Sequence, residues 1–346
     1  MTVFFTLSGF LVYRSFVAGQ YGLAPAPRLR AYAARRALRI VPAYWLALTI
    51  CLLVPGLGTI VGSLELVTLE NAYVYYGFAQ VYDLRDAAGG LGQAWTLCSE
   101  VVFYAALALY ALLGPRLGIG PSRVRRELLL LAGLAIASTL ARLVVHASLP
   151  NFGYPFNLTF AAVVLWFAAG MALATISCAG SSARPVAWAA RHPTGCYALG
   201  GAVFAALGLF GGLPSIDQPY TTMQWALEHV GYGVIAVLIV APAALGRSPS
   251  RVSALLASPP LRRLGQISYG VYLWHFVIVL VLKHHGSGDL LGARWPFASL
   301  LLTSLAGSIV AGELSYRLVE RPLLERSRRR RRSRRDRLRP VAESSA

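Results

Sequence analysis

The sequence predicts an all-α, polytopic integral membrane protein, and three observations carry that prediction. The 346 residues are 56% hydrophobic and only 13% charged, with a mean hydropathy of +0.58, which is too apolar for a soluble protein. Apolar runs of about 20 residues, the length that crosses a bilayer as a helix, recur along the chain. The arginines gather in alternate connections between these runs, as expected for a chain that crosses a membrane repeatedly.

The apolar runs predict nine transmembrane helices. In order, they are Val3–Ala18, Ala43–Gly62, Leu97–Leu113, Leu128–Val145, Phe156–Ser177, Gly195–Leu213, Ala226–Leu245, Gly265–Leu282 and Phe297–Val319. No repeat and no separable soluble domain interrupts them. We therefore expect one membrane domain over residues 1–325, followed by a polar tail at 326–346.

The distribution of positive charge predicts the orientation of these helices. The net charge is +18, and Lys283 is the single lysine among 32 basic residues. The first, third, fifth and seventh connections hold most arginines outside the tail, and such loops stay in the cytoplasm. We therefore expect the N-terminus outside and the C-terminus inside. The preference for arginine points to a GC-rich bacterial genome, and so to a bacterial cytoplasmic membrane.

The tail is strongly basic, with ten arginines between residues 326 and 339. It has neither the interleaved aromatic residues nor the folded module of a nucleic-acid-binding segment. A disordered cytoplasmic segment lying on anionic lipid gains about 1 kcal/mol per charge near the surface. We therefore expect membrane lipid, and no nucleic acid, as a partner. The four cysteines and six histidines show no metal-ligand spacing, so no metal site is expected.

Glu100 is the first candidate functional residue, because it stands at the head of an apolar run. An ionisable group inside a membrane helix is costly and is usually functional. Desolvation suits such a carboxylate to proton transfer near neutral pH. The alternative is an acid in the first helical turn, stabilised by the helix dipole.

The connection before Glu100 is long and rich in tyrosine, from Leu64 to Ala94, and it ends on the glycine-rich segment 89–92. It is too broken to span a membrane, which predicts an interfacial or re-entrant segment. It either covers the pocket that Glu100 faces or forms a structural lip.

Five motifs, taken in order, resemble the membrane-bound acyltransferase-3 family of O-acyltransferases. They are Phe4–Leu11, Arg35–Trp45, Trp95–Tyr104, Ser268–His275 and Glu320–Pro322. The resemblance implies a plasma-membrane enzyme that moves an acyl group from acyl-CoA, acetyl-CoA in particular, to a hydroxyl group. The acceptor it implies is a carbohydrate, as in polysaccharide O-acetylation, or a macrolide. Acyl-CoA is then a co-substrate, and no bound cofactor is expected.

The resemblance also implies one transmembrane helix more than the nine counted here. In the family that helix comes first and carries an arginine and, about eleven residues later, the histidine taken as the catalytic base. In this sequence no histidine precedes His146. We therefore expect Met1 to be a mis-assigned or truncated start. The alternative is that the chain is an inactive paralogue or fragment.

Acyl transfer needs a base for the acceptor hydroxyl and donors for the developing oxyanion. By resemblance, Glu100 orients and charge-stabilises the family histidine, or it handles the proton itself. Ser8 and Gly9 match the family's Ser-Gly pair and are expected to line the pocket or to pack helices closely. The motifs place Trp95 and Tyr104 beside them.

Arg35, Arg36 and Arg39 are the candidates for binding the donor's phosphates, because arginine binds phosphate bidentately. The alternative is that they only fix the orientation of the second span. Tyr269, Tyr272 and His275 share one helical face. We expect them to line the pocket, with His275 as a substitute base or a hydrogen-bonded structural residue.

Several other features leave alternatives open. Arg142 and Glu313 either pair with each other or line a cavity, and Glu320 and Arg321 are expected to form a charge pair at a helix end. Polar residues inside membrane helices also mark transport paths, so a transporter is the alternative from another functional class.

Overall fold

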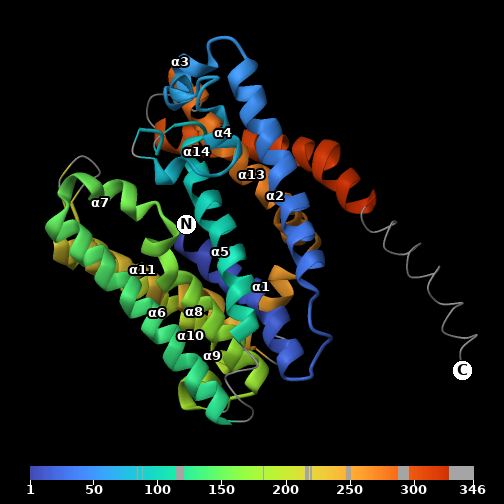
Figure 1. Ribbon diagram of the computed structural model, residues 1–346, viewed down its shortest axis with the longest axis vertical. Coiled ribbons are helices and arrows are strands. Elements are labelled where there is room, and N and C mark those ends of the chain that lie inside the picture. Colours follow the sequence, from blue (N-terminus) through green and yellow to red (C-terminus); the bar gives the residue numbers. More distant parts are fainter. Residues whose placement is uncertain are drawn as a thin grey trace, which may run out of the picture. The chain divides into compact units, whose positions relative to one another are not determined.

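The computed structural model describes residues 1–83, 85–87, 89–113, 121–181, 183–214, 218, 220–246, 251–286 and 296–326. Within these ranges the chain forms helices and no strand, which confirms the all-α prediction. The contacts divide the chain into two compact units. Unit 1 comprises residues 1–29, 78–87 and 95–256, and unit 2 comprises the remaining residues (Figure 1).

Unit 1 is a helical bundle around α8 (Phe160–Ala179), which contacts α1, α5, α6 and α11 (Figure 1). Small side chains along α8 allow this many neighbours to approach it. The other helices of the unit are α1 (Thr2–Gln20), α5 (Trp95–Leu113), α6 (Pro121–Ser148), α7 (Pro150–Asn157), α9 (Arg184–Arg191), α10 (Pro193–Phe210), α11 (Thr222–Leu245) and α12 (Arg251–Leu256), with a 3₁₀ turn at Gln80–Tyr82 (η2).

Helices α1 and α8 meet at two glycines. A Cβ added to Gly170 would lie 2.7 Å from the Phe10 amide nitrogen and closer still to the Thr6 carbonyl oxygen. A Cβ added to Gly9 would run into the Phe167 carbonyl oxygen in the same way. Close backbone approach at small residues is the usual means by which membrane helices associate. It fixes the position of α1 and therefore of the residues that α1 contributes to the bundle.

Different contacts join the helices at the two ends of unit 1. At one end Arg123 on α6 donates a hydrogen bond to Gln20, the last residue of α1. At the opposite end the ring of His146, near the end of α6, stacks on Trp225, near the start of α11. The first connection therefore begins, and the third connection ends, at the same end of unit 1. The alternation of charge along the sequence predicts this.

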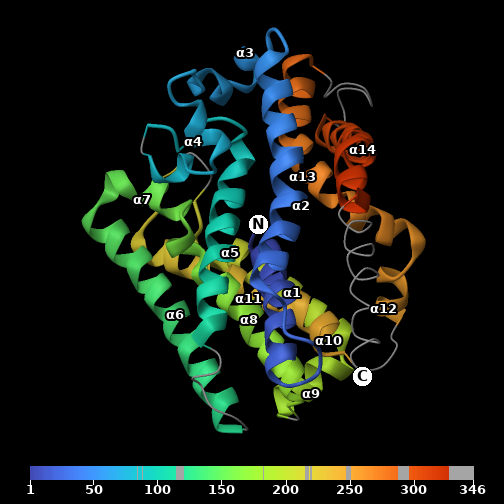
Figure 2. The same ribbon diagram turned by 45° about the vertical axis from the view of Figure 1, so that its right-hand side comes forward.

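Unit 2 is built on three long helices, α2 (Leu29–Leu53), α13 (Pro259–His284) and α14 (Pro296–Ser315) (Figure 2). The Tyr269 hydroxyl of α13 donates a 2.8 Å hydrogen bond to the Ile40 carbonyl of α2. Gly270 and Gly312 bring α13 and α14 together, since a Cβ on Gly270 would lie 2.8 Å from the Gly312 Cα. Shorter elements complete the unit: α3 (Leu57–Val61), η1 (Ser63–Leu66), α4 (Ala72–Tyr76), η3 (Gly92–Ala94) and a π-helical turn at Tyr316–Glu320 (η6).

The long connection after α2 forms short helical turns, as expected for a segment too broken to span. Tyr75 packs against Gly89 and Gly90, where a Cβ would collide with its ring. Gly90 has a φ of +73°, which glycine adopts without a steric penalty. The Ser63 hydroxyl donates a 2.7 Å hydrogen bond to the Gly90 carbonyl. In unit 2 these glycines therefore hold the segment against Tyr75.

Eight of the described helices are long and apolar enough to cross a membrane: Thr2–Gln20, Leu29–Leu53, Ser122–Ser148, Pro155–Ala179, Pro193–Phe210, Thr222–Leu245, Pro259–His284 and Pro296–Arg326. Helix α5, with 19 residues, lies where the remaining expected span was placed. The predicted bounds of the second span, Ala43–Gly62, are wrong. The helix begins at Leu29 because its arginine-rich turns are also helical, and it ends at Leu53, shortly before Pro55 and Gly56.

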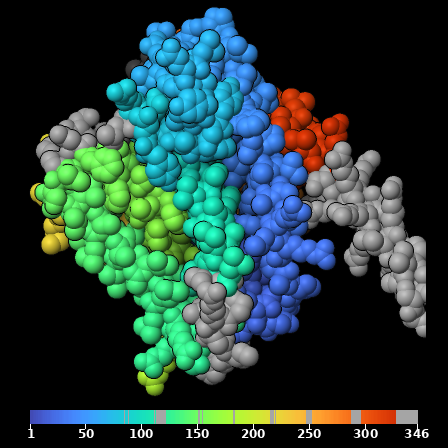
Figure 3. Space-filling view, viewed as in Figure 1, coloured from blue at the N-terminus to red at the C-terminus, as the bar shows by residue number. Residues whose placement is uncertain are grey.

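Helix α6 lies at the surface, as its green atoms in Figure 3 show, and many of its exposed side chains are apolar. An exposed apolar surface of this kind suits contact with lipid chains, and the chain is a multi-pass membrane protein. The exposed side chains are Leu129, Leu130, Leu134, Ile136, Leu140 and Val144. The orientation of the termini and the tail as a separate segment stay predictions, and residues 327–346 of the tail lie outside the described residues.

Candidate functional site

Glu100 lies in the second turn of α5 and is only 4% exposed. The Ser8 hydroxyl, on α1, donates a 2.7 Å hydrogen bond to Glu100 Oε1. The Tyr104 hydroxyl, one turn further along α5, donates to the same oxygen. Hydrogen bonds donated to a carboxylate stabilise its ionised form. The arrangement therefore suits a fixed negative charge.

Aromatic rings pack against α5, the helix that carries Glu100. The Phe5 ring stacks on Trp166 and meets Trp95 edge-on, with centroids 5.9 Å apart in both pairs. The Phe103 ring stacks on Phe167 at 4.1 Å. These rings reduce the access of water, and electrostatic interactions at Glu100 are stronger for that reason.

The structure brings together five residues that the sequence marks as site candidates. They all belong to unit 1 and are Ser8, Gly9, Trp95, Glu100 and Tyr104. Two roles were considered for Ser8 and Gly9, lining the pocket and packing helices closely. Ser8 donates a hydrogen bond to Glu100, and Gly9 packs against the Phe167 backbone. Whether any of the five takes part in catalysis stays a prediction.

His275, Tyr272 and Tyr269 belong to α13 in unit 2. The His275 Nδ1 lies 2.6 Å from the Tyr272 carbonyl oxygen, which can only accept, so Nδ1 carries the proton. The neutral ring therefore has its lone pair on Nε2, the form that a base requires. The Tyr272 hydroxyl donates to the Gln93 carbonyl, and the Gln93 amide donates a 2.6 Å bond to the Leu273 carbonyl.

The arginines considered for donor binding lie in the first half of α2. Arg35 and Arg39 are exposed, and Arg36 is half-buried. Arg39 interacts electrostatically with Glu320, whose side chain is 4% exposed. Arg39 therefore balances a buried carboxylate in unit 2, a structural task that the sequence did not suggest.

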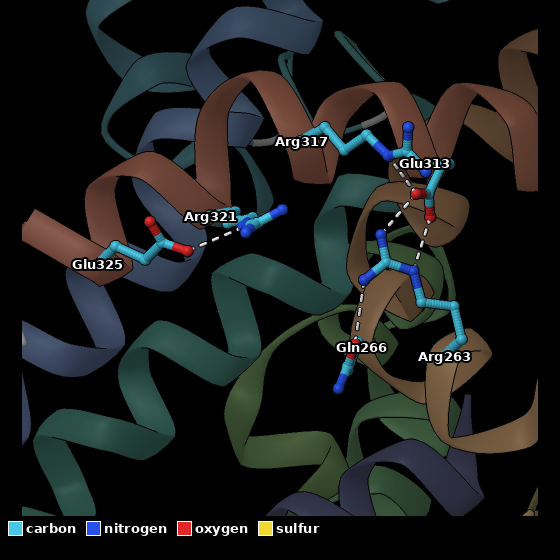
Figure 4. A network of polar contacts seen from close by, with 6 residues as sticks. All are labelled: Arg263, Gln266, Glu313, Arg317, Arg321 and Glu325. Carbon is cyan, nitrogen blue, oxygen red and sulfur yellow. Dashed lines mark hydrogen bonds and ion pairs between the residues drawn. The ribbon is translucent and has the colours of Figure 1, made fainter. Parts of the chain in front are cut away.

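The expected pair of Glu320 with Arg321 is wrong, and of the two alternatives for Arg142 and Glu313 the mutual pair does not form among the described residues. Glu313 binds Arg263 through hydrogen bonds of 3.0 and 2.5 Å and Arg317 through one of 2.5 Å, rather than Arg142 (Figure 4). Arg321 pairs with Glu325 at 2.8 Å rather than with its neighbour Glu320 (Figure 4). Neighbours in sequence point to different sides of a helix, whereas residues four apart share a face.

Glu127 is a buried carboxylate that the sequence analysis missed. It is fully buried, and its Oε1 accepts hydrogen bonds from the hydroxyls of Tyr13 on α1 and Thr175 on α8, the latter at 2.9 Å. Arg123 lies one turn earlier, with its Nε 3.9 Å from Glu127 Oε2. The signal was available, because Arg123 and Glu127 are four residues apart next to an apolar run.

The comparisons with known proteins agree with the motifs. Residues 1–313 match the family described as an acyltransferase domain. The chain belongs to the membrane-bound acyltransferase-3 family. It is 31% identical over 336 residues to the exopolysaccharide production protein ExoZ of Rhizobium meliloti, covering 95% of this chain and 90% of that protein. No solved structure matches the chain.

Two other relatives widen the comparison. Nodulation protein 10 of Rhizobium leguminosarum is 23% identical over 346 aligned positions, which cover 94% of this chain and 82% of that protein. The peptidoglycan O-acetyltransferase OatA of Listeria monocytogenes is 29% identical over 115 residues, 33% of this chain and 17% of that protein. As a family member the chain is an acyltransferase, and the family assignment argues against the transporter alternative.

Proposed function

We propose that this acyltransferase O-acylates a polysaccharide, taking an acetyl group from acetyl-CoA. The observation that supports the proposal most strongly is the buried Glu100 carboxylate with its two hydroxyl donors, in a chain similar to ExoZ over nearly its whole length. ExoZ and OatA are named for exopolysaccharide production and for peptidoglycan O-acetylation, which favours a polysaccharide over a macrolide acceptor. The enzyme acts in a bacterial cytoplasmic membrane.

In this proposal Glu100 supplies a fixed negative charge rather than taking the proton itself. Two hydroxyls already donate to its Oε1, so this oxygen is engaged in holding the carboxylate in place. Such a charge stabilises a cationic base as it takes the proton of the acceptor hydroxyl, as the aspartate of a catalytic triad does. The oxygen left on the acceptor attacks the thioester carbonyl, the C–S bond breaks, and the CoA thiolate recovers a proton.

Within unit 2, and independently of Glu100, His275 is a candidate for proton transfer, because its Nε2 carries the lone pair in the neutral ring. The donor's phosphates bind at Arg35 and Arg36, with Arg39 shared between the donor and Glu320. Arginine suits this task because it remains charged and forms bidentate bonds with phosphate.

The test is transfer of radiolabelled acetyl from acetyl-CoA to polysaccharide, with the purified protein in lipid nanodiscs. Transferred label should be released as acetate by mild base, as expected of an ester. Glu100→Gln should lower kcat by about a hundredfold or more, the usual scale for one electrostatic group. Glu65→Gln, at an exposed acid, is the matched control and should leave kcat unchanged. Label transfer by Glu100→Gln at the wild-type rate would refute the role of Glu100.

His275→Gln tests the base, with His284→Gln at an exposed histidine of the same helix as its control. Loss of transfer in His275→Gln alone supports His275 as the base. Equal activity in both variants places the base elsewhere. Arg36→Ala should raise the KM for acetyl-CoA, and an unchanged KM would count against donor binding there.

A further inference from the structure

A second polar cluster lies in unit 1, at the end where α6 finishes and α11 begins. Arg142 of α6 is 6% exposed, and its guanidinium lies over the Trp225 ring, 5.1 Å from the centroid. Its Nε has no hydrogen-bond partner among the described residues. A buried guanidinium inside a membrane helix is costly, so an unsatisfied donor on it needs a physical explanation.

His229, one turn after Trp225 on α11, is 1% exposed, and neither ring nitrogen has a partner in the described part of the chain. Trp166 packs on this ring at 4.7 Å, but the Trp166 indole donates its hydrogen bond to the His229 backbone carbonyl. A neutral imidazole offers one donor and one acceptor. Leaving both unsatisfied costs about 1–3 kcal/mol for each group, which a bound polar molecule would recover.

Further polar and aromatic groups complete the cluster. Glu228 is half-buried and interacts electrostatically with Arg142, yet within the described residues it forms no direct ion pair with it. The Trp225 ring also contacts Tyr220, with a centroid distance of 4.5 Å. An acid, a guanidinium and an imidazole thus stand beside a tryptophan and a tyrosine.

This cluster connects with the surroundings of Glu100 inside unit 1. The Phe5 ring lies against both Trp95, at the start of α5, and Trp166. Trp166 in turn packs on His229. One row of aromatic rings therefore runs from the Glu100 helix to the unsatisfied imidazole. The predicted orientation puts this end of the unit outside the cytoplasm, where a surface polysaccharide is found.

We propose that Arg142, Trp225, Glu228 and His229 form a binding subsite for a sugar unit of the acceptor. This inference rests on the proposed function. Sugar hydroxyls pair well with groups that donate and accept in a fixed plane, such as guanidinium, carboxylate and imidazole. Trp225 has a positioning part, because its ring holds the Arg142 guanidinium over it while His146 stacks on the same ring. A phosphate group fits less well, since Glu228 would repel it.

The test separates binding of the acceptor from binding of the donor. The probe is oligosaccharide released from the host's own surface polysaccharide by mild acid, and the protein is the full chain in nanodiscs. Arg142→Gln and Glu228→Gln should each raise the KM for this acceptor by about tenfold or more, equivalent to one lost polar interaction of about 1.4 kcal/mol. The KM for acetyl-CoA should not change. Arg191→Gln, at an exposed arginine of α9, is the matched control and should alter neither KM.

Calorimetric titration of the oligosaccharide without donor gives the second readout. Wild-type protein should bind it, Trp225→Phe should bind it more weakly, and Trp188→Phe, at an exposed tryptophan of α9, should bind it as wild type does. No binding by the wild type overturns the subsite. An unchanged acceptor KM in folded Arg142→Gln and Glu228→Gln also overturns it. The same holds if these variants are thermally destabilised and their KM values for acceptor and acetyl-CoA rise together. Binding that depends on Arg142 with no acetyl transfer would uphold the subsite while refuting the proposed function.

Discussion

Replacing Gly170 by alanine should loosen the contact between α1 and α8 and disturb Glu100 from a distance. The new Cβ would lie 2.7 Å from the Phe10 nitrogen and closer still to the Thr6 carbonyl oxygen. Helix α1 must therefore move by more than the about 0.7 Å that the nitrogen alone would require to reach ordinary contact near 3.4 Å. Ser8 moves with α1, and its 2.7 Å bond to Glu100 then stretches beyond the usual range.

Two terms set the size of this effect. Overpacking a well-packed contact costs about 1–3 kcal/mol, and a side-chain hydrogen bond between membrane helices is worth about 0.6 kcal/mol on average. Activity should suffer more than stability, because misplacing a catalytic constellation by about 1 Å can cost about a hundredfold in rate. The assay is thermal unfolding in nanodiscs together with the kcat of acetyl transfer.

Gly133→Ala and Gly201→Ala are matched controls, because a Cβ at either position meets no atom within 4 Å. Alanine in a helix interior favours the helix by about 0.5–1 kcal/mol over glycine, so these two variants should keep or raise the unfolding temperature. If Gly170→Ala unfolds with the controls and keeps full kcat, α1 does not depend on this contact and the reasoning is wrong.

Three further changes give separate tests. Glu127→Ala removes the acceptor of the Tyr13 hydroxyl, one of the two acceptors of the Thr175 hydroxyl and the charge that lies near the buried Arg123, so stability should fall by about 3–5 kcal/mol, measured by thermal unfolding. An unfolding temperature equal to that of Glu65→Ala would contradict it. Gly312→Leu places a bulky side chain against the Val271 backbone nitrogen and should prevent stable insertion. The readout is loss of the monodisperse peak in size-exclusion chromatography. Gly265→Leu, where a side chain meets open space, should keep this peak. Glu313→Gln removes the negative charge that pairs with Arg263 and Arg317. It should lower the unfolding temperature in low salt more than in high salt, because these groups are partly exposed and salt screens them. Equal lowering at both salt concentrations would argue against an electrostatic origin.

The helices could be predicted from the sequence because hydrophobic length is read directly from a window of residues. The start of α2 could not, since its arginine-rich turns lie outside such a window although they are helical. Glu127 was missed for the same reason, because it stands just before the run that begins at Leu128. Its burial depends on Tyr13 and Thr175, which lie far away in the sequence.

The candidate site divides in the same way. Glu100 stood out because an acid in an apolar run is rare, and the motifs placed Ser8 and Tyr104 near it. The neighbours of Arg142 could not be predicted from the sequence. Trp225 and Glu228 belong to a helix that begins about 80 residues later, and only the folded chain brings them close to Arg142. The place of Tyr269 in a pocket stays a prediction, and the sequence did not show that its hydroxyl donates to the α2 backbone.

The burial of Glu127 also constrains how the protein is made. Glu127 is synthesised 114 residues after Tyr13 and 48 residues before Thr175. Of its two hydroxyl partners, the one on α1 therefore exists before α6 is made, and the one on α8 is added afterwards. An acid inside a membrane helix is costly unless it has a polar partner. The order of the helices along the chain thus provides a hydrogen-bond donor for Glu127 before α8 is synthesised.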